Sequence, residues 1–146
     1  MVFTLASLLI RFLAGKASDR YGRVNVIKTG LLLMAFALCF TANAQTSFGL
    51  LLAAGAIGVA TGVLSPAVNA WTIDLSFPEH RGKAMATMYI ALEAGIGLGA
   101  LLAGWYYQDV IARIPQVIYI SSGVVLLALG YLLLRKKPAA TDDSAA

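Results

Sequence analysis

The chain has 146 residues, of which 12% are charged and 60% are hydrophobic, and its mean hydropathy is +0.80. A soluble domain usually has about a quarter charged residues, and one of this size still exposes roughly a third of its surface after folding. The composition therefore excludes an ordinary soluble domain and indicates a membrane protein. The formal net charge of +4 does not indicate nucleic-acid binding, because the location of charge matters more than its sum in a membrane protein.

Five apolar stretches predict five helices, at residues 2–15, 25–43, 47–73, 84–107 and 114–134. These runs are too long for strands and lack an alternating pattern, and lone hairpins cannot span lipid. No charged residue occurs between Lys28 and Asp74 or between Arg113 and Arg135. A helix needs ~20 apolar residues to cross a ~30 Å hydrocarbon layer. The expected fold class is all-α, a polytopic transmembrane helical bundle with five spans.

The first of these stretches, residues 2–15, is too short to cross a membrane. At 1.5 Å per residue it reaches only ~21 Å, so we interpret it as the end of a longer helix. The polar segment TANAQTS at residues 41–47 turns the chain between the second and third helices. Pro138 follows the fifth helix, so the membrane domain is expected at 1–137 and a disordered cytoplasmic tail at 138–146.

Basic residues lie almost entirely on one side of the predicted bundle. Arg113 is the exception in a loop on the other side, and Arg11 lies within the first helix. Positively charged loops face the cytoplasm, so the charged loops and the C-terminus are expected there and Met1 outside. The expected location is a bacterial cytoplasmic (inner) membrane, as a multi-pass protein. The basic residues on the cytoplasmic side are Lys16, Arg20, Arg23, Lys28, Arg81, Lys83, Arg135, Lys136 and Lys137.

The first loop has an ordered motif as well as charge. Its residues Gly15, Asp19, Arg20, Gly22 and Arg23 read G-x-x-x-D-R-x-G-R. The glycines allow tight turns, and the aspartate can cap a helix or pair with a neighbouring basic group as a breakable latch. The pattern resembles the signature loop of the major facilitator superfamily, which follows the second helix of that fold and recurs in weaker form after the eighth. A generic basic loop with a capping aspartate is the alternative.

A second loop carries the same resemblance. Pro78, Arg81, Gly82 and Ala84 form P-x-x-R-G-x-A between the third and fourth predicted helices. This is similar to the family's short cytoplasmic loop between two helices, which leads into a glycine-rich helix. Two motifs at a suitable separation extend the resemblance over the whole chain apart from its tail.

Two features of the family's first half are not intact in this chain. The third predicted helix has no intramembrane Arg, and the G-x-x-x-G-P element of exporters appears as Gly95, Gly99 and Ala100, with Ala in place of Pro. The resemblance therefore implies helices eight to twelve, a partial major facilitator fold. Residues 1–137 would be a truncated C-terminal half whose partner is a missing N-terminal half.

The third predicted helix carries two neighbouring stripes. Small residues recur every four positions as a seam for close helix packing, and Pro66 can also bend the helix. The polar stripe beside them would cost free energy against lipid, so it is expected to line a substrate cavity. Interhelical hydrogen bonding without substrate contact is the alternative. The seam comprises Gly58, Gly62, Pro66 and Ala70, and the stripe comprises Thr61, Ser65, Asn69 and Thr72.

Glu93 puts a carboxyl group near the middle of the fourth predicted helix. An ionised carboxylate there costs ~2.5–3.5 kcal/mol on insertion scales, so it must be protonated or face water or a cation. We interpret Glu93 and Tyr89, which share a helix face, as cavity-lining, with Glu93 coupling transport to protons or binding a cationic substrate. A structural hydrogen bond to a neighbouring helix is the alternative. The packing glycines of this helix are Gly95, Gly99 and Gly104.

Sequence motifs of enzymes and metal sites are absent. There is no Gly-rich phosphate loop and no Ser-His-Asp or Cys-His arrangement. Asp74 and His80 flank a predicted loop and are assigned capping or solvated roles, and His80 has no second ligand at metal spacing. The single cysteine, Cys39, can form no internal disulfide and is interpreted as a small apolar filler. We expect no enzymatic activity, no cofactor, no metal and no nucleic-acid partner.

The residues and the resemblance together imply a fragment of a secondary active transporter. It would move a small solute across the membrane by alternating access, coupled to protons, and the glycine pattern of the fourth helix favours efflux. Its partners would be the lipid bilayer, a small-molecule substrate and the N-terminal half. The alternatives are a non-transporting membrane scaffold or assembly partner, and a half-transporter that assembles with itself.

Overall fold

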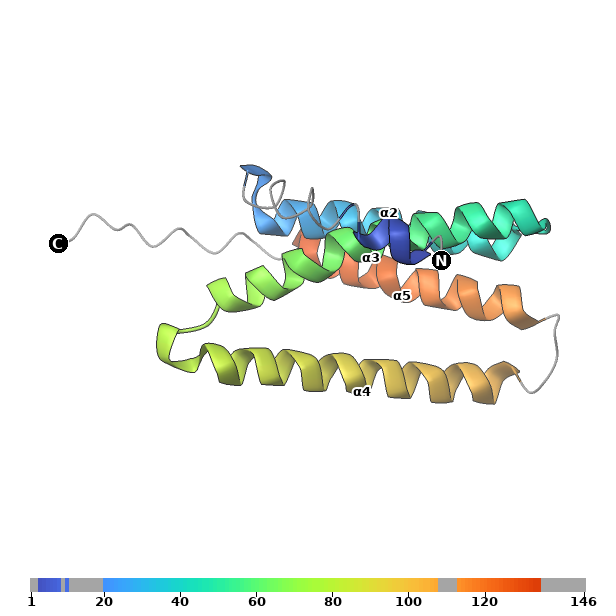
Figure 1. The fold of residues 1–146 in the computed structure, drawn as a ribbon. Helices are drawn as coiled ribbons and strands as arrows, with labels where there is room; N and C mark the ends of the chain where they lie inside the picture. The colour runs from blue at the N-terminus through green and yellow to red at the C-terminus, as the bar shows by residue number, and fades with distance from the viewer. Residues whose placement is uncertain (1–2, 9, 11–19, 108–112, 135–146) are drawn as a thin grey trace.

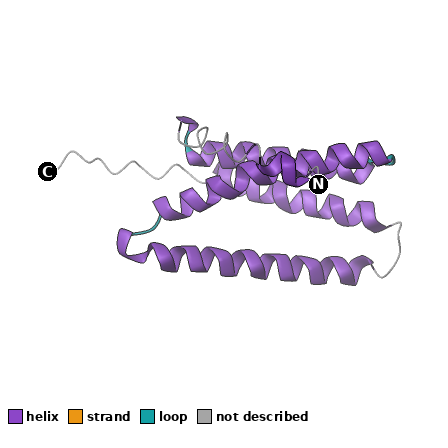
Figure 2. Cartoon of the chain, in the orientation of Figure 1, coloured by secondary structure: helices purple, strands orange, loops and turns teal. Residues whose placement is uncertain are grey.

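The computed structural model describes residues 3–8, 10, 20–107 and 113–134. Within this part the chain is helical, with short connections and no strand (Figure 1, Figure 2). The all-α prediction is confirmed for these residues. Residues 3–8 and 10 are helical, and the long helices are α2 (Arg23–Asn43), α3 (Ser47–Asp74), α4 (Arg81–Tyr107) and α5 (Ile114–Leu134), with the short 3₁₀ helix η1 (Pro78–His80) before α4.

The observed helix bounds follow the predicted ones closely. The bounds of α5 are those expected, α2 begins two residues before residue 25, and α3 ends one residue after residue 73. The largest difference is at α4, which begins at Arg81 rather than at residue 84. Pro78 occupies the first position of η1, where its missing N–H costs nothing, and η1 runs directly into α4. The charged residues of the loop therefore belong to the helix.

Within the described part of the chain, four helical segments are long and apolar enough to cross a membrane. They are Arg23–Asn43, Ser47–Asp74, Pro78–Tyr107 and Ile114–Leu134. Half of the first predicted span, residues 2–15, lies outside the described residues, as does the whole predicted tail at 138–146. Large apolar side chains cover the outer surface, among them Phe36, Trp105 and Leu127 at 67%, 74% and 75% exposure. Lipid is a suitable solvent for such a surface.

The core lies where α2 packs between α3 and α5. Val26 and Ile27 of α2 contact Ala67 of α3 and Leu132 of α5, and all four side chains are buried. Gly30 of α2 packs directly against Leu64 of α3, because a Cβ atom there would lie 2.8 Å from Cγ of Leu64. Close backbone approach through small residues replaces the hydrophobic driving force that lipid removes.

A polar contact joins α2 to α5 inside this core. Ser122 of α5 is only 2% exposed, and its Oγ donates to the carbonyl oxygen of Ala35 over 3.3 Å. The same Oγ lies 3.2 Å from Sγ of Cys39. Cys39, interpreted from the sequence as a small apolar filler, thus contacts a hydroxyl group.

Helix α4 stands at one side of the bundle and has no buried residue (Figure 1). Residues 89–102 are exposed throughout, and a Cβ atom added at Gly95, Gly97 or Gly99 would meet no atom within 4 Å. Its side-chain hydrogen bonds to other elements lie near its two ends, at Met88 and Tyr106. Most of the surface of α4 is thus left uncovered by the described residues.

Candidate functional site

The structure brings the described parts of both loop motifs to one end of the bundle, where α2 begins, α3 ends and α4 begins. We call this the Arg23 end and the opposite one the Tyr106 end. Gly22 precedes α2 with a φ of 84°, a left-handed conformation that glycine adopts without steric cost. It turns the chain into α2 and makes Arg23 the first residue of the helix.

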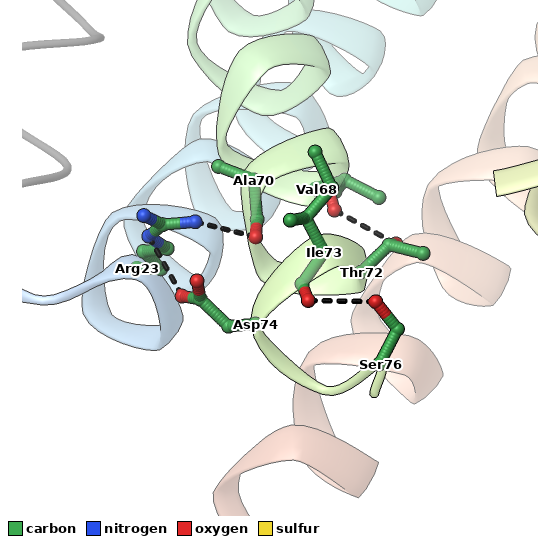
Figure 3. A network of polar contacts seen from close by, with 7 residues as sticks. All are labelled: Arg23, Val68, Ala70, Thr72, Ile73, Asp74 and Ser76. Carbon is green, nitrogen blue, oxygen red and sulfur yellow. Dashed lines mark hydrogen bonds and ion pairs between the residues drawn. The ribbon is translucent and has the colours of Figure 1, made fainter. Parts of the chain in front are cut away.

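Arg23 joins α2 to the last turn of α3 (Figure 3). Its Nε lies 2.8 Å from Oδ2 of Asp74, and its Nη1 donates to the carbonyl oxygen of Ala70. The side chains of Arg23 and Asp74 are 29% and 49% exposed, so water screens the pair only in part. A cation at the C-terminal end of α3 is also stabilised by the dipole of that helix.

Sequence reasoning assigned Asp74 a capping or solvated role and did not connect it to Arg23. A signal was present, because a tight turn at TANAQTS makes α2 and α3 antiparallel neighbours. The start of α2 must then lie near the end of α3. A lone acid at the end of a long charge-free helix, facing an arginine at the start of its neighbour, predicts an ion pair.

The remaining residues of the first motif are described only in part. Gly15 and Asp19 lie outside the described residues. Arg20 is exposed, with its Cζ 5.9 Å from the centroid of the Tyr21 ring, in reach of a weak cation–π contact.

The second motif forms the connection from α3 to α4. Ser76 donates from its Oγ to the carbonyl oxygen of Ile73 over 2.7 Å and so closes the end of α3 (Figure 3). Pro78 then starts η1, and the His80 N–H donates to the carbonyl oxygen of Phe77 over 2.9 Å. Arg81 and Gly82, in the first turn of α4, are exposed.

The small-residue seam of α3 lies against the first helical stretch. A Cβ atom at Gly58 would lie 2.5 Å from the carbonyl oxygen of Phe3, and one at Gly62 would lie 2.8 Å from that of Ser7. Both glycines are buried. Any larger residue would push the backbone of residues 3–7 away from α3, and the helix itself runs unbroken through Pro66.

The polar stripe of α3 is half-buried, and two of its hydroxyl groups bond to their own helix. Thr61 donates to the carbonyl oxygen of Ile57 over 2.8 Å, and Thr72 donates to that of Val68 over 2.9 Å (Figure 3). Thr72 Oγ1 also lies 3.2 Å from Sδ of Met88 on α4. Such bonds satisfy hydroxyl groups within a helix and leave them compatible with either lipid-facing or cavity-facing positions. Ser65 and Asn69 are half-buried between them.

Glu93 and Tyr89 lie on the uncovered part of α4. Both are exposed, and Glu93 makes no hydrogen bond or ion pair with any residue that the structure describes. The structure therefore does not bring Glu93 into contact with the polar stripe of α3. Gly104 lies near the Tyr106 end, and it too has no atom within 4 Å of an added Cβ. The described residues contain no group of three or more acidic, histidine or cysteine side chains that could hold a metal ion.

Sequence reasoning missed a polar cluster at the Tyr106 end. The Tyr106 hydroxyl group donates to Oε1 of Gln116 over 2.9 Å, and Arg113 Nη1 donates to the carbonyl oxygen of Tyr106 over 3.0 Å. The Arg113 Cζ lies 5.6 Å from the centroid of the Tyr106 ring. Beside this cluster an open apolar groove of about 320 Å³ runs between α4 and α5, and its lining is Ala103, Gly104, Tyr107, Ile114, Val117 and Ile118.

Comparisons with known proteins identify the family. The sequence model of the family described as Major Facilitator Superfamily matches residues 1–146. The chain is 25% identical over 134 residues to Multidrug resistance protein 1 of Bacillus subtilis, covering 92% of this chain and 34% of that protein. It is 31% identical over 94 residues to Multidrug resistance protein MdtH of Yersinia enterocolitica and of Yersinia pestis, covering 64% of this chain and 23% of each relative. The chain thus spans about a third or less of the length of these relatives.

A family match over the whole length agrees with the multi-pass helical architecture and with both loop motifs. The chain belongs to the Major Facilitator Superfamily, a family of membrane transporters and not of enzymes.

Proposed function

We propose that the chain is the part of a multidrug exporter that corresponds to helices eight to twelve. It would export small solutes by alternating access, together with an N-terminal half that the chain does not include. The family match and the names of the two bacterial relatives support this proposal, as does the share of each relative that the chain covers. The Arg23 end would face the cytoplasm of a bacterial cell, with the basic loops and the C-terminus on that side.

Glu93 is the observation that carries the proposal. It lies twelve residues after the start of α4, or about 18 Å along a helix of 27 residues, near the middle of a candidate span. An ionised carboxylate at this depth costs ~2.5–3.5 kcal/mol without a partner. The described residues supply none, so an aqueous cavity, a proton or a cationic substrate would stabilise it.

This position suits Glu93 for exchange between a proton and a cationic drug. The ionised carboxylate attracts a cation, and the protonated form releases it because the charge is gone. Export would be coupled to proton entry if alternating access exposed the carboxyl group of Glu93 to the two sides of the membrane in turn, with the proton bound outside and released inside. The polar stripe of α3, comprising Thr61, Ser65, Asn69 and Thr72, would supply hydrogen bonds to the substrate.

The Arg23–Asp74 ion pair would act as a latch between the start of α2 and the end of α3 that opens and closes while the two halves rock. An exposed pair contributes only ~0–1 kcal/mol, so it can open and close without a large barrier. The bond from Arg23 to the backbone of Ala70 adds a second point of attachment. The signature loop would then transmit motion of α2 to the end of α3.

Transport by the assembled protein tests the proposal. The chain is co-expressed with the N-terminal half of its transporter, reconstituted into vesicles with an imposed pH gradient, and assayed for movement of the cationic dye ethidium. Glu93→Gln should lower proton-driven transport at least about tenfold, which corresponds to ~1.4 kcal/mol. Glu79→Gln, at an exposed position in η1, is the matched control and should leave transport unchanged. Unchanged transport by the Glu93→Gln variant would contradict the coupling role, and no transport by the assembled pair would favour a scaffold.

A further inference from the structure

Helix α4 is attached to the other described helices by polar contacts at two points. Near the Arg23 end, Met88 Sδ lies 3.2 Å from the hydroxyl oxygen of Thr72 on α3. Near the Tyr106 end, Tyr106 bonds to Gln116 of α5 and to Arg113. Residues 89–102 between these points are exposed.

The two attachment points lie on one line along the helix. Met88 and Tyr106 are 18 residues apart, which makes about five full turns at 3.6 residues per turn. Their side chains therefore leave α4 in nearly the same direction. The distance between them along the axis is about 27 Å at 1.5 Å per residue.

Glu93 leaves the helix in another direction. It is five residues from Met88 and thirteen from Tyr106, and each spacing places it about 140° around the axis from the line that joins them. A rotation of α4 about its axis would thus move Glu93 in a circle while breaking both attachments. The attachments set the direction of the carboxyl group without touching it.

We propose that Met88 and Tyr106 are positioning residues that fix the rotation of α4 and so aim Glu93. The inference about rotation stands on these contacts alone, and its meaning for transport rests on the proposed function. Tyr106 contributes more than Met88, because its hydroxyl group, its carbonyl oxygen and its ring each hold a neighbour. Two anchors on one line resist rotation, whereas either one alone leaves the far end of α4 free to turn.

A nitroxide scan of α4 measures its rotation directly. Single cysteines at positions 90–98 are introduced in a Cys39→Ala background, labelled, and reconstituted in phospholipid vesicles, and the accessibility of each label to oxygen is measured. The side of α4 that carries the attachments is the less open one, with Leu92 at 50% and Ile90 at 69% exposure. The accessibility should therefore vary with the period of the helix, and the phase of this variation reports which side of α4 faces α3 and α5. The scan needs no transport activity, so its result is independent of the assay for Glu93→Gln.

The variants come in matched pairs that the structure supplies. Tyr106→Phe removes the hydroxyl group that bonds to Gln116. Its control is Tyr107→Phe, which removes the hydroxyl group of the next residue, a residue that lines the apolar groove. Met88→Leu removes the sulfur at Thr72, and Met85→Leu makes the same change three residues earlier. Gln116→Met removes the acceptor of the Tyr106 hydroxyl group, whereas Gln116→Glu retains an acceptor at the same place.

The double variant Tyr106→Phe with Met88→Leu should shift the phase of the accessibility pattern around the helix axis. We expect a shift of at least about a third of the ~100° rotation between consecutive residues. Tyr106→Phe alone should shift the phase in the same direction by a smaller angle. Gln116→Met should reproduce that shift, because it removes the same hydrogen bond, and Gln116→Glu should keep the original phase. The proposal would be overturned if the double variant and Gln116→Met had the same phase as the controls, Tyr107→Phe and Met85→Leu. If the double variant does not insert into vesicles, the Gln116 pair alone decides between these results.

Discussion

Arg23, the first residue of α2, is paired with Asp74, the last residue of α3, with Nε 2.8 Å from Oδ2. The pair joins two helices that run antiparallel through a tight turn, so it closes the open end of a helical hairpin. Because Arg23 also belongs to the signature loop, a motif recognised from the order of its residues has a physical role in helix packing. The pair links that loop to the connection that leads into α4.

Asp74→Asn should lower the free energy of unfolding by about 0.5–1 kcal/mol, because the charge that Arg23 faces is lost while the side chain keeps its shape. The measurement is unfolding of the chain by SDS in mixed micelles. A double-mutant cycle of Arg23→Ala and Asp74→Ala should give a coupling free energy of the same size. Glu79→Gln changes an exposed acid nearby and should have no effect. A coupling free energy of zero would show that the pair contributes nothing to the fold.

Arg23→Lys should not substitute fully for arginine at this position. The guanidinium group reaches Asp74 with Nε and the carbonyl oxygen of Ala70 with Nη1, and these donors have a fixed relative geometry. A lysine ammonium group is a single point charge that satisfies one of the two. The unfolding free energy of Arg23→Lys should therefore lie between those of the unchanged chain and Arg23→Ala. If Arg23→Lys were as stable as the unchanged chain, a positive charge alone would be sufficient at this position.

Much of the fold could be predicted from the sequence, because a helix that crosses lipid must be long, apolar and free of charge. The charge-free runs on both sides of TANAQTS are α2 and α3, and the bounds of α5 are those expected. Turns were also predictable, since polar residues cluster where the chain leaves the apolar medium. The differences lie at charged helix ends, because the prediction ends a helix where charge begins: α2 begins at Arg23, α3 ends at Asp74 and α4 begins at Arg81.

The rotation of each helix could not be predicted in the same way. A helix whose apolar residues are spread around all sides carries little information about which side meets a neighbour, and α4 is of this kind apart from Glu93. Contacts such as Cys39 with Ser122, or Tyr106 with Gln116, depend on the register between two helices. The stripe of α3 was visible in the sequence as a spacing of polar residues. The residues that face this stripe come from other helices, so its spacing does not predict them. The residues that face Glu93 could not be predicted for the same reason.

Ser122→Ala should destabilise the packing of α5 on α2 by about 0.6 kcal/mol, the typical size of an interhelical hydrogen bond in a membrane protein. The buried hydroxyl group donates to Ala35 of the neighbouring helix, so its loss leaves only the intrahelical bonds of that carbonyl. Ser121→Ala is the matched control, because the exposed Ser121 donates to Val117 within its own helix. The SDS titration should separate the two variants. Equal effects would mean that the contact between helices contributes no stability.

Thr46→Ala should weaken the first turn of α3. The Thr46 Oγ1 accepts a hydrogen bond from the N–H of Gly49 over 3.1 Å and so caps the N-terminus of this helix. Loss of such a cap costs about 1 kcal/mol. Hydrogen exchange at the Gly49 N–H should become faster in Thr46→Ala and stay unchanged in Thr46→Ser, which keeps the hydroxyl group. Unchanged exchange in the alanine variant would show that lipid or other residues stabilise this end.

Gly62→Ala should be one of the most damaging small changes in the chain. The added methyl group would lie 2.8 Å from the carbonyl oxygen of Ser7, and it would also meet the side chain of Ile10. Backbone cannot move aside as easily as a flexible side chain, so overpacking here should lower the unfolding free energy by about 1–3 kcal/mol. Gly97→Ala adds the same methyl group to α4, where no atom lies within 4 Å, and should be neutral or slightly stabilising in this chain. If both substitutions proved neutral in the SDS titration, the first helical stretch would not pack against α3 through this seam.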